Sequence, residues 1–297
     1  MGFKVEMDES DYKIIPNFRN MKKRSLSLMI LIMFTFCTSL TAQIKIFIET
    51  DLEGVSGVFN FNQTREKGSP ENIQACEYFM GDLAAVIKGL KDGGADEIIV
   101  IDGHGNQAII PHLMVPGAIY VTGKPKPDGN HWRLDKSFSG IVMFGFHAMM
   151  GTKDGVLNHT QSSKTENRYW YNGVESGELA QTAIIAGYFG VPPILVTGDV
   201  ATCREAVRFF GNEIVTVATK EGVSREAAAL YPFEETRKAL YEGAKRSISV
   251  IPKCKPYLVQ VPIKAKMEYL DFDPSLPKPR LVGKEWIIPT ALQLLDQ

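Results

Sequence analysis

The sequence predicts an α/β fold: a mostly parallel, doubly wound sheet with helices on both faces, plus a smaller C-terminal α+β portion. The first observation is an apolar run at residues 44–48, which has the length and β-branched content of a buried strand. A helical apolar stripe follows at residues 73–90, and Ser69 and Pro70 before it suit an N-cap and a first helical position. A second apolar run at residues 97–101 completes a β–α–β unit, whose two strands we expect to be parallel.

Apolar runs and helical patterns continue to alternate along the chain. A shorter strand with its flanks is expected at residues 113–122, and further strands at residues 140–145, 193–197, 214–218 and 258–263. Further helices are expected at residues 176–188, 200–210, 224–230 and 232–248. Residues 169–174 carry Asn172 and Gly173 at their centre, a pair that favours a tight β-hairpin.

The first 42 residues differ in composition from the rest of the chain. A basic start at residues 21–24 precedes an apolar, uncharged segment at residues 26–41 and then Ala42, a small residue suited to a cleavage site. This order is typical of a secretory signal peptide, and the apolar segment is short for a membrane span. We expect residues 1–42 to be a leader and signal peptide, with no stable membrane anchor left after cleavage near Ala42. The mature chain would then be exported, to the periplasm or beyond, with a retained anchor as the alternative and Met21 as the expected true start.

Charge and cysteine content exclude some classes of function. The formal net charge of −1 offers no basic face, so we expect no nucleic-acid partner. Removal of the signal peptide would leave Cys76, Cys203 and Cys254, an odd number without close spacing. Such a set suits neither a disulfide framework nor a cysteine zinc site, and small buried hydrophobes are the expected role.

Residues that bind metals follow several of the predicted strands. Asp51 and Glu53 come after the first strand, and in an extended chain side chains two residues apart point the same way. The second strand is followed by Asp102 and His104, and the strand at residues 140–145 by His147. Because the carboxyl ends of parallel strands share one edge of a sheet, these side chains are expected to meet in one crevice.

Glu178 adds a fifth candidate at a predicted helix start, where the helix dipole favours an ionised carboxylate. Imidazole and carboxylate without thiolate suit zinc or a similar divalent ion in a catalytic site. Five such ligands exceed the need of one open site and suit two metal ions that share a bridging carboxylate.

Each candidate has an ordinary structural alternative. The acids after the first strand could belong to a solvated loop, His104 could be a loop or capping residue, and His147 could be a hydrogen-bonded core histidine. Glu178 could be an ordinary acid of a first helical turn. The repeated occurrence of such residues at strand ends favours the metal site. His112 and His131 fall outside that pattern and are expected to be structural, and Asp199 is expected to be a helix N-cap.

These motifs, together with others in the chain, make it resemble the bacterial zinc-dependent D-aminopeptidase family over residues 44–263. The matching motifs are Asp-Leu-Glu-Gly-Val-Ser-Gly at 51–57, Asp-Gly-His at 102–104, Gly-Phe-His-Ala at 145–148, Asn-His-Thr at 158–160, Gly-Val-Glu-Ser-Gly-Glu-Leu at 173–179, Ala-Gly-Tyr-Phe-Gly-Val-Pro at 186–192 and Thr-Gly-Asp at 197–199. Their order and spacing make the resemblance specific, whereas any one of them alone would be weak.

The resemblance implies a dinuclear zinc site with two Zn²⁺ per chain. Its ligands would be Asp51, Glu53, His104, His147 and Glu178, with Asp51 bridging the two ions and His159 as a catalytic group. It further implies a homo-oligomer, a decamer of stacked rings with the active sites facing an inner chamber. On this reading residues 43–266 form the metallohydrolase domain and residues 267–297 a divergent C-terminal tail. Asp102 and Asn158 are expected to orient the ligating histidines.

The function expected from these observations is that of a metallo-aminopeptidase. It would release N-terminal amino acids, expected to be D-residues, from short peptides by means of a metal-activated water. One alternative is another dinuclear metal amidohydrolase that acts on cell-wall fragments. A second is an exported α/β solute-binding protein without catalysis, whose crevice acids recognise a cationic ligand.

Overall fold

The computed structural model describes residues 43–105, 108–123 and 133–295. The expected leader, signal peptide and cleavage site at residues 1–42 lie outside these residues. Within the described part, no helix is both long and apolar enough to span a membrane.

The larger of two sheets in the described residues has seven strands in the order β3-β2-β1-β4-β7-β8-β9. These are β1 Lys45–Thr50, β2 Glu97–Asp102, β3 Ile119–Val121, β4 Gly140–Phe144, β7 Pro193–Asp199, β8 Val215–Ser224 and β9 Ala227–Leu230. Every neighbouring pair is parallel except β8 and β9. β4 and β7 are buried along their whole length, as expected for central strands covered on both faces.

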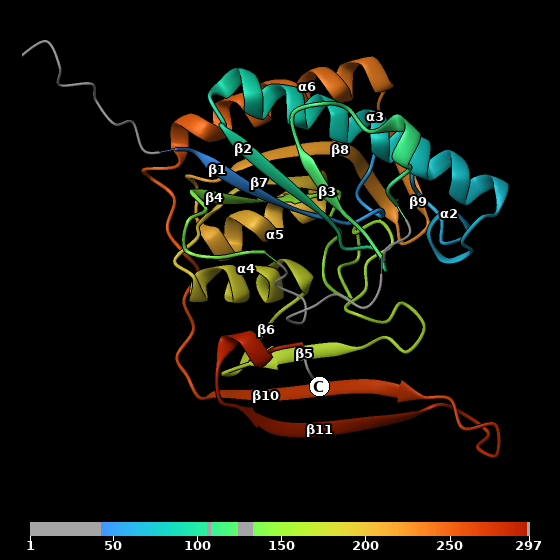
Figure 1. Cartoon of the computed structure of the whole chain (residues 1–297). Coiled ribbons are helices and arrows are strands. Elements are labelled where there is room, and N and C mark those ends of the chain that lie inside the picture. The colour runs from blue at the N-terminus through green and yellow to red at the C-terminus, as the bar shows by residue number, and fades with distance from the viewer. Residues whose placement is uncertain (1–42, 106–107, 124–132, 296–297) are drawn as a thin grey trace, which may run out of the picture. The chain divides into compact units, whose positions relative to one another are not determined.

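Helices cover both faces of this sheet, as Figure 1 shows. On one face α3 (Pro70–Gly93) packs against α6 (Phe233–Val250), and on the other lie α4 (Glu178–Tyr188) and α5 (Val200–Phe210). The apolar core is accordingly divided into two layers, one that includes α3 and α6 and one that includes α4. The α/β fold, doubly wound and mostly parallel, is therefore confirmed. Shorter helical segments are α2 (Asn62–Arg65), η2 (Pro111–Leu113) and η4 (Ala291–Gln293).

The predicted helix start at Ser69 is confirmed by its contacts. The Ser69 side chain accepts a hydrogen bond from the Asn72 amide, and Pro70 occupies the first helical position. Gly94 ends α3 with a φ of 109°, a left-handed conformation that favours glycine.

A second sheet of four strands, in the order β11-β10-β5-β6, contains the smaller portion of the fold. Its strands are β5 Arg168–Tyr171, β6 Val174–Glu175, β10 Ile263–Asp271 and β11 Arg280–Ile288, and every neighbouring pair is antiparallel. The predicted hairpin between β5 and β6 is confirmed, with positive φ at both Asn172 and Gly173. β10 runs across the boundary between residues 266 and 267 and pairs with β5, so part of the expected tail belongs to this sheet.

Two predictions of local structure were wrong. Residues 224–230 do not form a helix, because β8 extends to Ser224 and turns back into β9. The strand predicted at residues 258–263 lies later in the chain, as β10, and the long β11 was missed. The short strand predicted with its flanks at residues 113–122 is confirmed as the three-residue strand β3, which follows the turn of η2. Of the three cysteines, Cys76 is buried as expected and the other two are half-buried, with no disulfide in the described structure.

Candidate metal centre

The predicted ligands lie at the carboxyl edge of the large sheet and at one helix start. Asp51 and Glu53 follow β1, His104 follows β2, His147 follows β4, and Glu178 is the first residue of α4. β1 lies between β2 and β4 in the sheet, so these three strands deliver their terminal residues side by side.

The turn after β1 is bonded directly to the end of β4. The Asp51 amide donates to the Phe144 carbonyl over 2.8 Å, and the Gly54 amide donates to the Gly145 carbonyl over 2.7 Å. A side chain at Gly54 would collide with the carbonyl oxygen of Phe146. Glycine at this position therefore allows the acidic turn to lie directly against the segment that carries His147.

Asp51, Glu53 and His104 form the first of two groups that could hold a metal ion. His104 Nδ1 lies 2.9 Å from Asp51 Oδ1 and 3.1 Å from Glu53 Oε2. Both carboxylates are buried. Three ligand-type atoms thus converge from two strand ends, as the sequence predicts.

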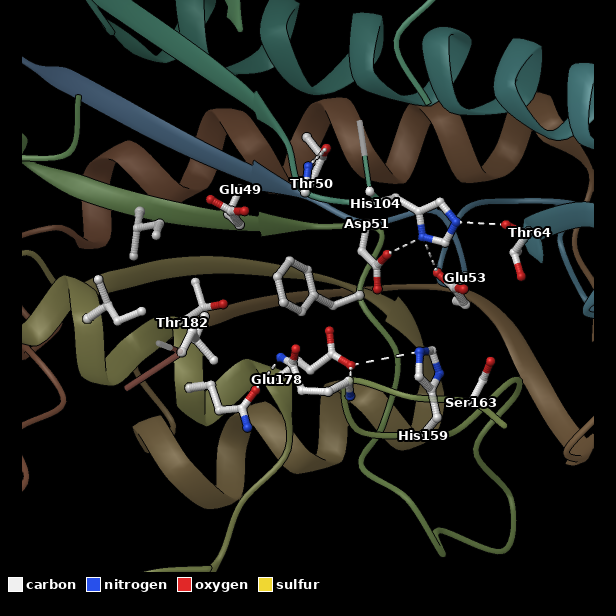
Figure 2. A pocket seen from close by; sticks show the side chains of 18 of the residues that line it. Glu49, Thr50, Asp51, Glu53, Thr64, His104, His159, Ser163, Glu178 and Thr182 are labelled. Carbon is white, nitrogen blue, oxygen red and sulfur yellow. Dashed lines mark hydrogen bonds and ion pairs between the residues drawn. The ribbon is translucent and has the colours of Figure 1, made fainter. Parts of the chain in front are cut away.

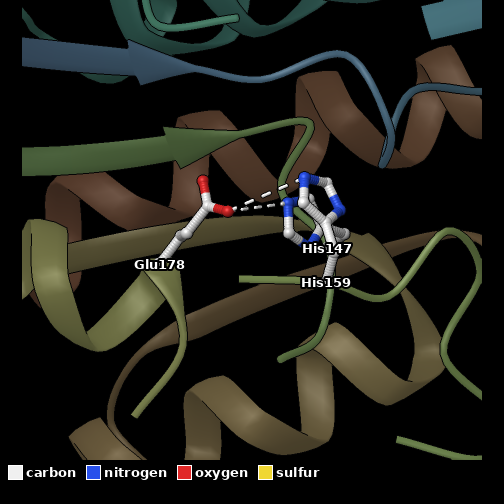
Figure 3. A group of neighbouring side chains, drawn as sticks. All are labelled: His147, His159 and Glu178. Atoms are coloured by element: carbon white, nitrogen blue, oxygen red, sulfur yellow. Dashed lines mark ion pairs between the residues drawn. The ribbon is translucent and has the colours of Figure 1, made fainter. Parts of the chain in front are cut away.

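His147, His159 and Glu178 form the second group, shown in Figure 3. Glu178 Oε1 lies 3.5 Å from His147 Nε2 and 3.8 Å from His159 Nε2, and the two imidazole rings stack with centroids 3.9 Å apart. Asp51 links the two groups, because its second oxygen, Oδ2, lies 3.2 Å from His147 Nε2. Its position between the groups suits the predicted bridging carboxylate.

Main-chain carbonyl groups orient all three histidine rings. The contacts are His104 Nε2 to the Thr64 oxygen at 2.9 Å, His147 Nδ1 to the Ala148 oxygen at 3.0 Å, and His159 Nδ1 to the Leu157 oxygen at 2.8 Å. A carbonyl oxygen can only accept, so each of these nitrogens carries a proton. In a neutral ring the other nitrogen then presents its lone pair to the carboxylates, the orientation that a metal ligand requires.

The expectation that Asp102 and Asn158 orient the histidines was wrong. Asp102 instead accepts hydrogen bonds from the Ala108 and Ile109 amides and from the Thr122 hydroxyl. The side chain of Asn158 closes its own loop, through contacts with the Gly151 amide and the Gly155 carbonyl oxygen. Carbonyl groups of the main chain take the expected place of both side chains.

The carboxylates strongly perturb the protonation of this site. Burial raises the pKa of Asp51, but hydrogen bonds from His104 and His147 outweigh burial and hold that pKa well below its usual range. Burial likewise raises the pKa of Glu178, which the charge of His147 lowers to about 2. Burial lowers the pKa of His104 and His147, but the neighbouring carboxylates raise both well above the ordinary value. The acids therefore favour a second proton on these two rings, and a divalent cation would take that proton's place.

Several polar atoms of the site are buried and, in the described structure, face only other side chains of the two groups. They include Asp51 Oδ2, Glu53 Oε2 and His147 Nε2. Buried polar atoms are normally paired, so such a cluster calls for an explanation. Nitrogen and oxygen ligands in two linked groups fit divalent cations such as zinc, and this fit rests on the side chains of this chain.

Comparisons with known proteins agree with this geometry. A family model described as D-aminopeptidase matches residues 44–273. The chain belongs to the D-aminopeptidase family. It is therefore a peptide-bond hydrolase. A relative, the D-aminopeptidase of Bacillus subtilis (strain 168), is 28% identical over 215 residues, which cover 71% of this chain and 76% of the relative.

A solved structure of similar fold is that of the Zn-dependent D-aminopeptidase DppA from Bacillus subtilis, described as a self-compartmentalizing protease. The TM-score is 0.75 at 22% sequence identity, and the match covers 84% of this chain and 94% of that one. At this identity the match establishes the fold of this D-aminopeptidase family member.

A cavity of about 400 Å³ lies between the two candidate ligand groups of this family member. Figure 2 shows Asp51, Glu53 and His104 on one side of the cavity and Glu178 and His159 on the other. Away from these groups the cavity is lined by apolar side chains, Phe47, Leu134, Ile141, Phe146 and Ile185, together with the polar Glu49 and Thr182. The site can therefore hold a small molecule with one end at the polar groups and an apolar part beside them.

The structure places His159 in a loop, as predicted, but deeply buried and next to the ligand candidates. Two residues that flank it, Leu157 and Gln161, have φ values of 53° and 63°, which non-glycine residues seldom adopt. Strained backbone of this kind persists where the surrounding structure enforces it, often at functional sites. The position of His159 is compatible with a catalytic role or with metal ligation, so its role stays a prediction.

Sequence reasoning missed Lys220 and Thr219 of β8. The Lys220 ammonium donates to the carbonyl oxygens of Glu53 and Val55, and the Thr219 hydroxyl donates to that of Gly54. Together they hold the main chain of the acidic turn. Lysine and threonine in a strand ordinarily indicate a solvated face, so no local signal marks either residue as part of the site.

The remaining polar residues singled out from the sequence lie away from the two groups or outside the described structure. Asp199 caps α5 by accepting from the Thr202 amide, as predicted. His112 is exposed in η2, in keeping with a structural role, and His131 lies outside the described residues.

Proposed function

We propose that the chain is a dinuclear zinc aminopeptidase that releases N-terminal D-amino acids from short peptides. The observation that carries this proposal is the pair of ligand groups joined by Asp51, with buried oxygen and nitrogen atoms that have no other partner in the described structure. The description of the matching family and the name of the Bacillus subtilis relative support D-residues as substrates. The Zn-dependence stated for the structural relative supports zinc as the metal.

Two ions have separate sets of candidate ligands in this arrangement. Glu53 and His104 would hold one ion, His147 and Glu178 the other, and Asp51, which lies close to both histidines, would be shared by the two. Zinc in such a site supplies Lewis-acid polarisation of a scissile carbonyl and activation of a water molecule at neutral pH. The protein fixes the approach of both groups, since every ligating histidine is anchored to the main chain.

His159 would serve as the proton carrier of the reaction. Its Nδ1 proton is bonded to the Leu157 carbonyl, so Nε2 is the nitrogen available on the side of Glu178. Burial, followed by the charge of His147, lowers the pKa of His159, which favours the neutral ring. A neutral ring can accept a proton at Nε2 from the attacking water and then deliver it to the nitrogen of the departing amine as the peptide bond breaks, as general acid–base catalysis requires.

The shape of the cavity suits the amino-terminal residue of a peptide. An apolar side chain could occupy the space beneath Phe47 and Ile141, while the peptide bond lies between the two ligand groups. Chirality would be selected by the direction in which the α-carbon places its side chain, which depends on the walls of this cavity and not on the metal ligands.

The experiment that tests the proposal combines metal analysis with matched substrates. The zinc-loaded protein should contain about two zinc ions per chain and should cleave D-alanyl dipeptides faster than their L-alanyl counterparts. His104→Ala should lose metal and activity while it stays folded, because a ligand is removed at the edge of the sheet. Protein that takes up only trace metal, even after zinc is added, would contradict the proposal and favour a solute-binding function. Stoichiometric zinc with cleavage only of cell-wall amides would favour the alternative amidohydrolase.

Assembly and export are separate parts of the proposal. The description of the structural relative as self-compartmentalizing supports a closed homo-oligomer here, with a decamer as the expected form. Light scattering at micromolar concentration should report such a particle, and a monomer would contradict it.

The basic and apolar character of residues 21–41 supports export, and the sequence read from the N-terminus of the secreted or periplasmic protein should begin near residue 43. A mature chain that still carries residues before Met21 would contradict both the predicted cleavage and the predicted start.

A further inference from the structure

A second cavity, of about 620 Å³, lies next to the metal-binding cavity. Three residues, Gln161, Gln181 and Leu295, line both. The second cavity lies against the four-stranded sheet, whose position beside α4 can be followed in Figure 1. Nothing in the proposed reaction so far uses this space.

The floor of the second cavity consists of two cross-strand rows of side chains. One row is Tyr171, Ala265 and Trp286, and the other is Tyr169, Met267 and Lys284, in each case from β5, β10 and β11, and all of them except the buried Ala265 line the cavity. Residues two apart in a strand share a face, so the two rows lie on the same side of the sheet. Ala265 has the smallest side chain of its row, which leaves space between the aromatic rings on either side of it.

The chemistry of this floor suits the carboxyl-terminal part of a peptide. The indole nitrogen of Trp286 is covered by neighbouring atoms and has no hydrogen-bond partner in the described structure, so a small shift of the ring would give a peptide carbonyl or carboxylate oxygen an unused donor. Lys284, in the neighbouring row, supplies a cation for a terminal carboxylate. Glu285 also lines the cavity, but strand alternation directs its side chain to the opposite face of β11.

A chain of hydrogen bonds forms the wall between the two cavities. The main-chain amide of Gln161 donates to Glu178 Oε1 over 2.7 Å, and Nε2 of the Gln161 side chain donates to Gln181 Oε1 over 2.8 Å. Gln181 in turn donates to the Tyr171 hydroxyl over 2.9 Å. This wall begins at a candidate metal ligand and ends in the floor of the second cavity. Because Gln161 and Gln181 line both cavities, a peptide bound at the metal site would pass beside these two side chains into the second cavity.

We propose that the second cavity binds the residues that follow the first leaving residue of a peptide substrate, with a free terminal carboxylate near Lys284. This inference rests on the proposed peptidase function and adds a preference for peptide length. Tripeptides and tetrapeptides with a free carboxyl end would then be better substrates than dipeptides, which are too short to reach the floor.

The test compares D-alanyl-alanine, D-alanyl-trialanine and the amide of the latter as substrates of zinc-loaded protein. Wild-type kcat/KM should be higher for the tetrapeptide. Trp286→Phe, which keeps an aromatic ring but removes the donor, and Lys284→Met should each lower the tetrapeptide kcat/KM about 10-fold, mainly through KM. The effect of Lys284→Met should disappear with the amide, because no carboxylate remains to bind. Lys278→Met, an exposed lysine between β10 and β11, is the matched control.

A loss that is equal for dipeptide and tetrapeptide, or no loss at all, would overturn the proposed subsite. Calorimetric binding of trialanine separates this result from a failure of the proposed function. Wild-type protein that cleaves no peptide but binds trialanine, with weaker binding in Trp286→Phe, would keep the subsite and reject the peptidase reaction. Wild-type protein that cleaves dipeptides but shows no preference for the tetrapeptide and no trialanine binding would keep the peptidase reaction and reject the subsite.

Discussion

The ammonium group of Lys220 donates a hydrogen bond of 2.6 Å to the main-chain carbonyl oxygen of Glu53, in the fully buried interior behind the candidate metal centre. A second bond, of 2.7 Å, reaches the Val55 carbonyl. A lysine is seldom buried so completely, because removal of its charge from water is costly. Burial accordingly lowers the pKa of Lys220 to about 8. The cation ties β8 to the turn that aims both acids, so we expect it to be a positioning residue for the metal site.

Lys220→Met tests this role, because methionine preserves most of the volume and removes the ammonium. We expect zinc affinity to fall by about 10- to 100-fold, the usual effect of removing a partner that orients metal ligands. Competition with a chelator measures that affinity, and circular dichroism shows whether the fold is retained. Lys238→Met, on the exposed surface of α6, controls for the loss of one charge. Unchanged zinc affinity in a folded Lys220→Met protein would contradict the positioning role.

His159→Ala distinguishes a catalytic histidine from a metal ligand. If His159 carries a proton, the variant should keep both zinc ions and lose turnover by about 100-fold or more. Metal analysis and steady-state kinetics with a D-alanyl dipeptide provide the two measurements. His112→Ala, in the exposed η2 segment, is the control and should resemble wild type. Loss of metal in His159→Ala would make this histidine a ligand, and full activity would assign it a structural role.

Glu205→Gln tests a buried acid behind the site. Glu205 accepts a hydrogen bond from the Met149 amide over 2.8 Å, and its other oxygen is buried without a partner in the described structure. Burial raises the pKa of Glu205 from 4.5 to about 7. A raised acid pKa in the folded state means that this group's contribution to stability is complete below pH 4.5 and is lost as the pH rises to 7. The loss is on the order of 3 kcal/mol.

The free energy of unfolding in urea, measured for both proteins across this pH range, checks the expectation. The stability of wild type relative to Glu205→Gln should fall between pH 4.5 and 7 and then level off. Glu242→Gln, an exposed glutamate of α6, controls for the removal of a negative charge. Parallel curves for wild type and Glu205→Gln would show that Glu205 titrates in the folded protein as it does in the unfolded chain.

The parts of the fold that sequence could predict are those governed by local signals. Ser69 and Pro70 predicted the start of α3, and Asn172 with Gly173 predicted the hairpin between β5 and β6. The meeting of His104 with Asp51 follows from a general property of parallel sheets, whose strands end at one edge.

Other features depend on contacts between distant segments and leave no local trace. Residues 227–230 are mostly alanine and favour a helix, yet pairing with β8 makes them a strand. The prolines near residues 274–279 disfavour a continuous strand and hide the two strands on either side of them. In the structure they occupy the connection between β10 and β11. The partners of the histidines were missed because every residue has a carbonyl group, and only the fold determines which one is near.

The anchoring of all three histidines on carbonyl oxygens has a consequence for how this site could evolve or be redesigned. Side-chain replacement can exchange a ligand, but no point substitution removes the carbonyl of Thr64, Ala148 or Leu157. His104 therefore presents Nδ1 to the carboxylates of the candidate metal centre, and the other two rings present Nε2. This arrangement lasts as long as the main chain keeps its present conformation. A different tautomer or a different orientation of a histidine ring would require an insertion, a deletion or another change in the conformation of the loop that supplies the carbonyl group.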